Sequence, residues 1–290
     1  MYLLINNQVS HQKKTINMNL IKSLKSIFFE EGISNFVKRK KNKMFLDNRT
    51  LFTIDYKENK VKIFLNKKFG YVDQYIFDHG IYEKEIIDDI CDHLTKEKTM
   101  LDIGSNIGQH SLILAPFCKQ IFAFEPIPEI FEEFKKSINA NHYKNITLQN
   151  FAIGNKKEKT FINYNSKNAG ASSLVNQTQN SKQIPIQIDL LENVLPENLK
   201  FDVIKLDVEG YEAVVILSNK DILLKNRPVI FLEFSPSCIK NEGNYSADEL
   251  IDFFLMNDFE IYSRRNQKTF RANLSELHVT DNWIVRPRNN

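Results

Sequence analysis

The sequence predicts an α/β fold with a doubly wound, mostly parallel sheet, and three observations support this prediction. From Thr99 onward, short apolar runs alternate with helical segments in the rhythm of consecutive βαβ units. The apolar runs show little alternation with polar residues, which is typical of strands covered on both faces. A glycine-containing turn at residues 102–108 joins the first of these runs to a helical segment. With 290 residues, 42% of them hydrophobic, the chain can form one such domain and an additional N-terminal part.

The N-terminal part divides into two segments before the main domain, which we place at residues 99–290. Residues 1–45 predict a basic amphipathic extension, because apolar side chains recur at helical spacing and a basic run follows them. Residues 20–43 then either make peripheral contact with an anionic membrane surface or a partner, or form a helix packed on the domain with solvated lysines. We favour the second interpretation, because charge runs mostly face water. Residues 46–98 hold a hairpin and a helix that lead into the main domain.

The elements follow from the periodicity of the apolar residues. Before the main domain we expect a hairpin of residues 51–56 and 61–65 around a polar turn at 57–60, followed by a helix at 82–94. In the main domain we expect buried strands at residues 100–103, 120–125, 146–150, 201–207 and 228–234, and helices at 107–117 and 128–141.

The last two expected strands, residues 259–263 and 282–285, have a polar connection short enough for an antiparallel pair. Residues 163–181 are polar and predict a long loop. Such a loop either covers a site and becomes ordered when ligands bind, or simply connects two elements.

Composition excludes several classes of protein. The formal charge of +3, from 39 basic and 36 acidic residues, is too balanced to require nucleic acid as an obligatory partner. The three cysteines lie far apart without a C-x-x-C pair, so we expect small buried thiols in a reducing cytoplasm rather than disulfides or zinc ligands. No apolar run is long enough to span a bilayer, and residues 1–5 are too short for a signal peptide. We expect a cytoplasmic protein, with the inner membrane surface as the alternative.

The turn at residues 102–108 carries the first candidate binding site, because open α/β sheets bind ligands at the carboxyl ends of their strands. Gly104 permits a tight turn, Asn106 tolerates a left-handed conformation, and Gly108 lets the helix start close to a ligand. The carboxylate of Asp102 would repel a pyrophosphate, which favours bare amides at a helix end. It suits a cationic ligand instead, such as the amino and sulfonium groups of S-adenosylmethionine.

Glu125 follows Asp102 by 23 positions, at the end of the second expected strand. A carboxylate there can accept hydrogen bonds from both hydroxyls of a ribose. After the third strand, adenine could stack on Phe151 and bond to Asn150, although Phe151 fits a core position equally well. The predicted cofactor-binding residues are therefore Asp102, Gly104, Ser105, Asn106, Gly108, Glu125, Pro126, Asn150 and Phe151.

The fourth strand of the regular region ends in alternating charges. Lys205, Asp207 and Glu209 lie on one side of an extended chain, and at the end of a central strand they would face the transferred group. The alternative is a buried ion pair between Lys205 and one acid that serves structure alone. We favour a functional role, because a buried charge cluster is costly.

Six short motifs follow one another within residues 81–234. They are 102–108 (Asp-Ile-Gly-Ser-Asn-Ile-Gly), 125–128 (Glu-Pro-Ile-Pro), 152–154 (Ala-Ile-Gly), 168–174 (Asn-Ala-Gly-Ala-Ser-Ser-Leu), 205–210 (Lys-Leu-Asp-Val-Glu-Gly) and 231–233 (Phe-Leu-Glu). In this order they resemble the FkbM-type methyltransferases, with Ser105 where the family often has alanine. The resemblance implies a seven-stranded, Rossmann-like class I methyltransferase fold whose last strand is antiparallel. It also implies S-adenosylmethionine as donor and O-methylation, frequently of a sugar or polyketide hydroxyl.

The expected reaction is attack of an acceptor oxygen on the sulfonium methyl, which requires a general base. Asp207 or Glu209 is the candidate base and Glu233 the next choice, while His110 and His79, the latter expected in a loop, are weaker candidates. Two of the acids could instead hold Mg²⁺ or Ca²⁺, but no compact metal motif occurs, so no metal is expected.

Three other functions compete with methylation of a small-molecule or glycan hydroxyl. An RNA methyltransferase would use the basic extension, but no RNA-binding module is recognisable. A nicotinamide oxidoreductase would need a different glycine motif. A non-catalytic binding module that keeps the fold is the third, since fold alone does not fix function.

Overall fold

The computed structural model describes residues 49–66, 68, 70–165, 172, 174, 181–239 and 245–288. The chain divides into two units, Met1–Asp47 and Asn48–Asn290, and every described residue belongs to the second. The predicted basic extension, residues 1–45, therefore lies outside the described residues. Within the described part of the chain, no helix is both long enough and apolar enough to cross a membrane.

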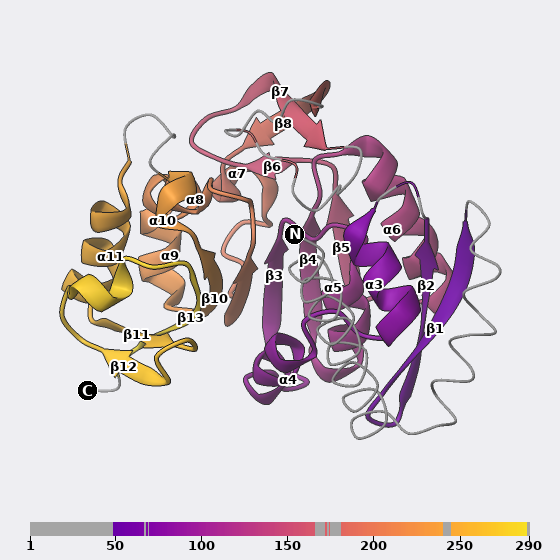
Figure 1. Cartoon of the computed structure of the whole chain (residues 1–290), viewed down its shortest axis with the longest axis horizontal. Helices are drawn as coiled ribbons and strands as arrows, with labels where there is room; N and C mark the ends of the chain where they lie inside the picture. The colour runs from indigo at the N-terminus through magenta and orange to yellow at the C-terminus, as the bar shows by residue number, and fades with distance from the viewer. Residues whose placement is uncertain are drawn as a thin grey trace, which may run out of the picture. The chain divides into compact units, whose positions relative to one another are not determined.

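The centre of the domain is a mixed sheet in the order β12-β11-β13-β10-β9-β3-β4-β5 (Figure 1). Its strands are β3 (Thr99–Ile103), β4 (Gln120–Phe124), β5 (Ile146–Gln149), β9 (Val203–Leu206), β10 (Val229–Phe234), β11 (Phe259–Ser263), β12 (Lys268–Phe270) and β13 (Asp281–Pro287). The five strands from β5 to β10 are parallel, and β13 is antiparallel to both β10 and β11. The predicted doubly wound, mostly parallel sheet with an antiparallel last strand is confirmed.

The predicted number of seven strands is wrong, because the sheet of the described residues has eight. The additional strand β12 lies in the polar connection between the last two expected strands and pairs antiparallel with β11. It is only three residues long, and its single apolar anchor is the buried Phe270. By pairing with β11 it covers the backbone groups that this strand would otherwise expose at the sheet edge.

The described helices are α3 (Tyr71–His79), α4 (Lys84–Asp92), α5 (Gln109–Leu114), α6 (Pro128–Asn141), α7 (Leu191–Val194), α8 (Glu212–Ser218), α9 (Lys220–Asn226), α10 (Pro236–Ile239) and α11 (Ala247–Met256). Helix α6 has its predicted bounds, since Pro128 opens it and the left-handed His142 ends it. Helix α4 begins later than predicted, because the backbone of Tyr82 bonds to the side chain of Gln109 instead of continuing a helix. Helix α5 gives way at Ala115–Phe117 to a short 3-10 helix that contains a proline.

The predicted hairpin is present as β1 (Thr50–Tyr56) and β2 (Asn59–Leu65), with a turn of only two residues rather than four. It is anchored to α6, where the Phe64 amide donates to the Ser137 hydroxyl at 3.0 Å. Helix α3, which follows it, was not predicted. His79, expected in a loop, is instead the last residue of α3.

A separate three-stranded sheet follows the third strand of the central sheet, in the order β6-β8-β7. It contains β6 (Ala152–Ile153), β7 (Glu158–Asn165) and β8 (Ser181–Asp189), with β7 and β8 antiparallel. The predicted loop at residues 163–181 is therefore wrong at both ends, which are strand. Ile184, Ile186 and Ile188 alternate with exposed residues along β8, a two-residue period that the polar composition of the region concealed. Between these strands the structure describes only residues 172 and 174.

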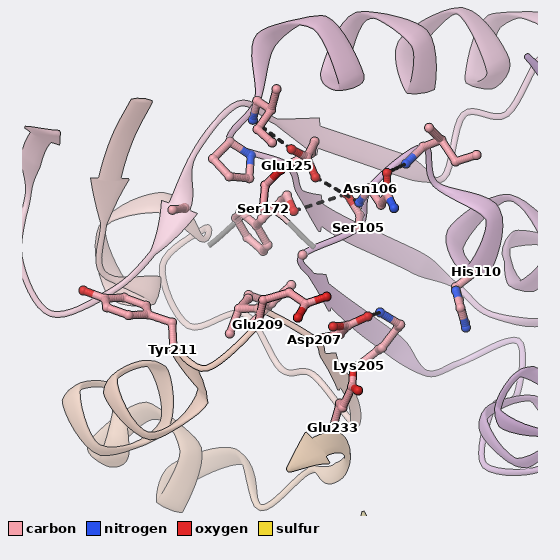
Figure 2. A pocket seen from close by; sticks show the side chains of 18 of the residues that line it. Ser105, Asn106, His110, Glu125, Ser172, Lys205, Asp207, Glu209, Tyr211 and Glu233 are labelled. Carbon is pink, nitrogen blue, oxygen red and sulfur yellow. Dashed lines mark hydrogen bonds and ion pairs between the residues drawn. The ribbon is translucent and has the colours of Figure 1, made fainter. Parts of the chain in front are cut away.

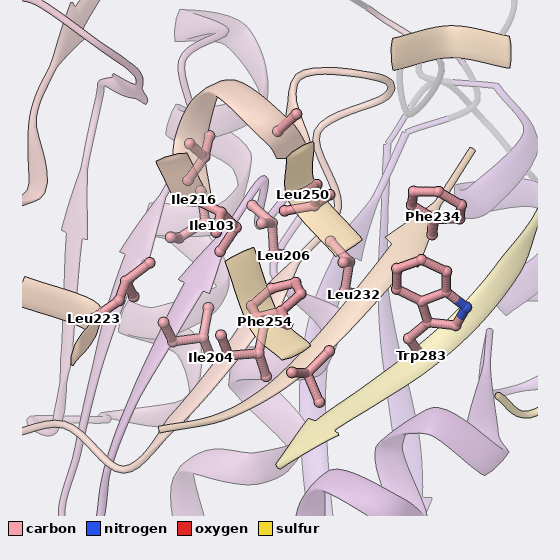
Figure 3. Packing of buried hydrophobic residues seen from close by; sticks show 14 of the residues in the cluster. Ile103, Ile204, Leu206, Ile216, Leu223, Leu232, Phe234, Leu250, Phe254 and Trp283 are labelled. Atoms are coloured by element: carbon pink, nitrogen blue, oxygen red, sulfur yellow. The ribbon is translucent and has the colours of Figure 1, made fainter. Parts of the chain in front are cut away.

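Alternate residues of the central strands face opposite layers. Leu232 and Phe234 of β10 join a hydrophobic cluster with α8, α9 and α11, where the rings of Phe234 and Trp283 stack at 3.8 Å (Figure 3). Phe231 faces the other way and contacts the ring of His93, directly after α4. The expectation of strands covered on both faces is confirmed. Of the cysteines, Cys91 and Cys118 are buried as expected, but Cys238 is partly exposed.

The turn between β3 and α5 is compressed between two neighbouring elements. Gly104 has φ 80°, and a Cβ atom there would lie 1.9 Å from the backbone oxygen of Asp207. Gly108 has φ 81°, and a Cβ atom there would lie 2.1 Å from the ring of Phe134 on α6. The ring of Phe134 therefore requires glycine at position 108, a packing role that we did not predict from the sequence.

Gly108→Ala should destabilise the fold more than a glycine substitution that introduces backbone strain alone. Gly80→Ala is the matched control, because Gly80 has φ 92° with no atom within 4 Å of the added Cβ. We expect about 1 kcal/mol from Gly80→Ala, and about 2 kcal/mol more from Gly108→Ala through overlap with Phe134. Urea unfolding of both variants measures the difference, and equal losses would contradict the packing described for this turn.

Candidate functional site

A pocket of about 1170 Å³, partly open to solvent, lies at the carboxyl ends of β3, β4, β9 and β10. It is located where the strand order reverses, since the chain passes outward from β3 to β5 and then returns to β9 beside β3. Ten of the predicted site residues line it: Gly104, Ser105, Asn106, Glu125, Pro126, Phe151, Lys205, Asp207, Glu209 and Glu233. Sequence motifs that are more than 100 residues apart thus meet in one cavity.

Glu125 is a carboxylate fixed by the backbone of two loops. One oxygen, Oε2, accepts a hydrogen bond from the Asn106 amide at 3.0 Å, and Oε1 accepts one from the Ile127 amide at 2.8 Å (Figure 2). Asn106 has φ 51°, which confirms the expected left-handed conformation. Burial raises the pKa of Glu125 to about 7, although both amide bonds act in the opposite direction. Each oxygen still has a lone pair available for a ligand.

Three predicted cofactor-binding residues do not line the pocket. Asp102 is fully buried and accepts a hydrogen bond from the Ser111 hydroxyl at 2.6 Å. Gly108 packs against Phe134, as described above. Asn150 donates to the backbone oxygens of Glu125 at 2.8 Å and Pro126 at 3.0 Å. Asp102 and Asn150 therefore support the pocket walls from behind.

One end of the pocket is apolar. Phe151 lies in its wall rather than in the core, and it is accompanied there by Ile127, Ile153, Ile162 and Leu174. This end adjoins Glu125, so the cavity offers an apolar compartment next to a fixed carboxylate. That combination suits a planar base joined to a ribose.

The other end is a cluster of charges around Lys205 (Figure 2). The ammonium of Lys205 lies 3.2 Å from Oδ2 of Asp207. Burial alone would lower the pKa of Lys205, but the carboxylates of Asp207, Asp102 and Glu83 raise it above its usual value. One buried cation therefore interacts with several acids. The charge cluster includes Asp102 and Glu83, which the alternating 205–209 pattern does not indicate.

Two of the acids have strongly raised pKa values. Repulsion from Asp207 and burial raise the pKa of Glu233, whose side chain also hydrogen-bonds to Asp207. Burial, with Asp207 and Glu212 nearby, raises the pKa of Glu209 to about 8. Both side chains therefore hold a proton more readily than an ordinary glutamate does. Asp207 is the acid that has the Lys205 ammonium directly beside it.

Several site residues were missed by sequence reasoning. Oε1 of the buried Glu212 accepts bonds from the amides of Val208, at 3.2 Å, and Gly210, at 3.1 Å, so it shapes the loop that carries Glu209. Tyr82 and Glu83 line the pocket from the segment between α3 and α4. No motif distinguishes these residues in the sequence, because their roles depend on elements that meet only in the fold.

His110 also lines the pocket, and its Nε2 lies 3.5 Å from a carboxylate oxygen of Glu83. Burial, with Lys205 nearby, lowers its pKa well below the usual value, so the imidazole is neutral and weakly basic. No group of three or more His, Cys, Asp or Glu side chains in the described part of the chain is arranged to hold a metal ion.

Comparison with known proteins gives a family match. A family model described as the methyltransferase FkbM domain matches residues 102–262. No curated protein matches the chain.

Several solved structures show a limited similarity to the chain, with TM-scores below 0.5. The methyltransferase FkbM from Methylobacillus flagellatus KT is 12% identical with a TM-score of 0.43, covering 72% of this chain and 46% of that one. An rRNA methylase from Streptococcus thermophilus is 9% identical with a TM-score of 0.40, covering 70% and 94%. The Streptococcus mutans protein SMU.1697c, in complex with SAH, is 11% identical with a TM-score of 0.41, covering 70% and 94%. The chain thus spans less than half the length of the first of these proteins.

The raised pKa of Glu209 makes the stability of the unliganded protein pH-dependent. Its pKa is about 8 in the folded state and 4.5 ordinarily. The stabilisation from the bound proton is therefore complete below pH 4.5 and is lost as the pH rises through 8. In Glu209→Gln, the decrease in unfolding free energy between pH 5 and pH 8 should be smaller by on the order of 2 kcal/mol. Urea unfolding across this range measures it, with Glu132→Gln on the exposed face of α6 as control. Parallel curves for wild type and Glu209→Gln would contradict the assignment.

Proposed function

The chain belongs to the methyltransferase FkbM domain family, and on this basis we propose that it transfers a methyl group from S-adenosylmethionine to a hydroxyl of a sugar, glycan or related small molecule. The observation that carries this proposal is the composition of one pocket. It joins an apolar compartment and the fixed carboxylate of Glu125 to the acid cluster around Lys205.

The residues present fit S-adenosylmethionine. Glu125 has free lone pairs for the two ribose hydroxyls, and Phe151 with its apolar neighbours offers a compartment for adenine. At the opposite end, carboxyl oxygens of Glu83, Asp207 and Glu209 line the pocket beside the cation Lys205, and such oxygens stabilise a positively charged ligand. When bound, S-adenosylmethionine supplies an electrophilic methyl group on a positively charged sulfur.

In this proposal Asp207 is the general base. An alcohol must lose its proton as it attacks, so an ionised acceptor of that proton is needed in the pocket. The pKa values of Glu209 and Glu233 are raised, whereas Asp207 has the ammonium of Lys205 3.2 Å from its Oδ2. This geometry makes Asp207 the acid best placed for this role. Lys205 orients the Asp207 carboxylate through its ion pair, and Glu233 supplies a hydrogen bond to it. Together they hold the base at the floor of the cavity.

The charge of the pocket also bears on the competing functions. Carboxyl groups of Glu83, Asp207, Glu209 and Glu233 surround the place where an acceptor would react. Among the described residues Lys205 is their one buried cation and is paired with Asp207, so this place offers no free basic group to the phosphates of RNA, which proteins bind through such groups. A small hydroxyl-bearing acceptor therefore fits the pocket better than RNA does.

The proposal predicts that S-adenosylhomocysteine raises the melting temperature and that NAD does not. A ligand at about 100 times its Kd stabilises a protein by about 2.7 kcal/mol, which corresponds to several degrees. Glu125→Gln should lose most of the shift, because one oxygen is replaced by an amide nitrogen that cannot accept a bond. Glu133→Gln is the matched control, since Glu133 is similarly buried but lies outside the pocket. Absence of a shift in the wild type, or an equal shift in Glu125→Gln, would contradict the proposal.

A further inference from the structure

Three tyrosines form a compact aromatic cluster beside the acid end of the pocket. The ring centroids of Tyr75 and Tyr82 are 5.4 Å apart, those of Tyr71 and Tyr75 are 6.0 Å apart, and those of Tyr71 and Tyr82 are 6.1 Å apart. His79 extends the cluster, with its ring 4.5 Å from that of Tyr75. The cluster belongs to α3 and to the segment before α4, neither of which carries a motif. No role described above uses it.

The tyrosines differ in exposure, and this gives the cluster a direction. Tyr71 and Tyr82 both line the pocket, and Tyr71 is 54% exposed. Tyr82 is half-buried, and its pKa is raised by burial and then by the carboxyl groups of Glu83, Asp207 and Glu233. Tyr71 and Tyr82 therefore form one wall of the cavity, with the solvent-exposed ring of Tyr71 at one side and the acids of the reaction centre beside Tyr82.

Helix α5, which follows the glycine turn, holds this wall in place. The Gln109 side chain donates to the Tyr82 backbone oxygen at 2.8 Å and accepts from the Tyr82 amide at 2.8 Å. The next residue, His110, lies 3.5 Å from Glu83. The two hydrogen bonds with Gln109 thus fix the backbone of Tyr82 against α5, and this sets the distance of the wall from the glycine turn.

We propose that Tyr71 and Tyr82 are the stacking surface for the methyl acceptor, and that the acceptor presents an uncharged sugar ring to them. This inference rests on the proposed function and names the acceptor side of the same site. A sugar ring has an apolar C–H face that packs against aromatic rings and hydroxyls that bond to carboxylates, and the wall offers both. The acids beside Tyr82 disfavour a phosphate-bearing ring at this position.

The test is saturation-transfer NMR on the full chain in the presence of S-adenosylhomocysteine. The probes are methyl glycosides of glucose, galactose, mannose, rhamnose and N-acetylglucosamine, with an RNA trinucleotide as the anionic competitor. We expect transfer to the ring protons of at least one glycoside. Tyr71→Ala should weaken its binding about fivefold, as expected for the loss of one stacking contact. Tyr71→Phe, which keeps the ring, should bind the glycoside as tightly as the wild type does.

Phe161→Ala is the matched control, because Phe161 is 56% exposed but does not line the pocket. Calorimetric titration with S-adenosylhomocysteine separates the possible failures. A wild type that binds this compound but no glycoside, or the trinucleotide in place of a glycoside, overturns the inference and leaves the cofactor assignment intact. A Tyr71→Ala protein that loses affinity for S-adenosylhomocysteine also overturns it, because the wall would then serve the cofactor. A wild type that does not bind the compound overturns the proposed function itself.

Discussion

The buried ammonium of Lys205 is the interaction on which the site depends. Lys205 lies opposite Asp102 in the register of two neighbouring parallel strands, so both side chains reach the same layer. It forms an ion pair with Asp207. Burial raises the pKa values of Asp102 and Glu83, and the Lys205 ammonium opposes this rise. Without this cation, several acids would share a poorly solvated space with no compensation, which is strongly destabilising. The cation therefore permits an acidic cavity at the centre of the sheet.

The acidic cavity acquires its shape from loops whose conformations are fixed by their neighbours. The Gly104 turn passes within contact distance of Asp207, Glu212 holds the loop that carries Glu209, and Asn150 binds the carbonyls beside Glu125. These contacts use backbone groups that would otherwise be buried without partners. A fold that satisfies its own loop backbone in this way presents its carboxylates to a ligand in fixed positions, so little reorganisation is needed upon binding.

Sequence reasoning predicts those parts of the fold in which local pattern and tertiary role agree. Helix α6 has proline at its start and apolar residues at helical spacing, and its predicted bounds hold. The alternation of Lys205 and Asp207 brings both to one pocket, but Glu209 reaches it differently from the prediction. Strand β9 ends at Leu206, and Glu209 has φ 54° in a turn instead of continuing an extended chain. Other features depend on tertiary contacts that no local pattern encodes. Strand β12 forms because β11 offers a free edge, and Gly108 is required by the ring of Phe134. The aromatic wall was missed because Tyr71 and Tyr82 belong to no motif and come together only through the packing of α3 and the segment before α4.

The central claim is that one cavity holds the adenosine part of the donor near Glu125 and directs the reacting end toward Asp207. A crystal structure of the protein soaked with S-adenosylhomocysteine tests it most directly. We expect ligand density that contacts Glu125 and Phe151 and extends toward Asp207, with the Gln109–Tyr82 bonds retained. Density bound elsewhere on the protein, or in the cavity but without contact to Glu125, would contradict the account.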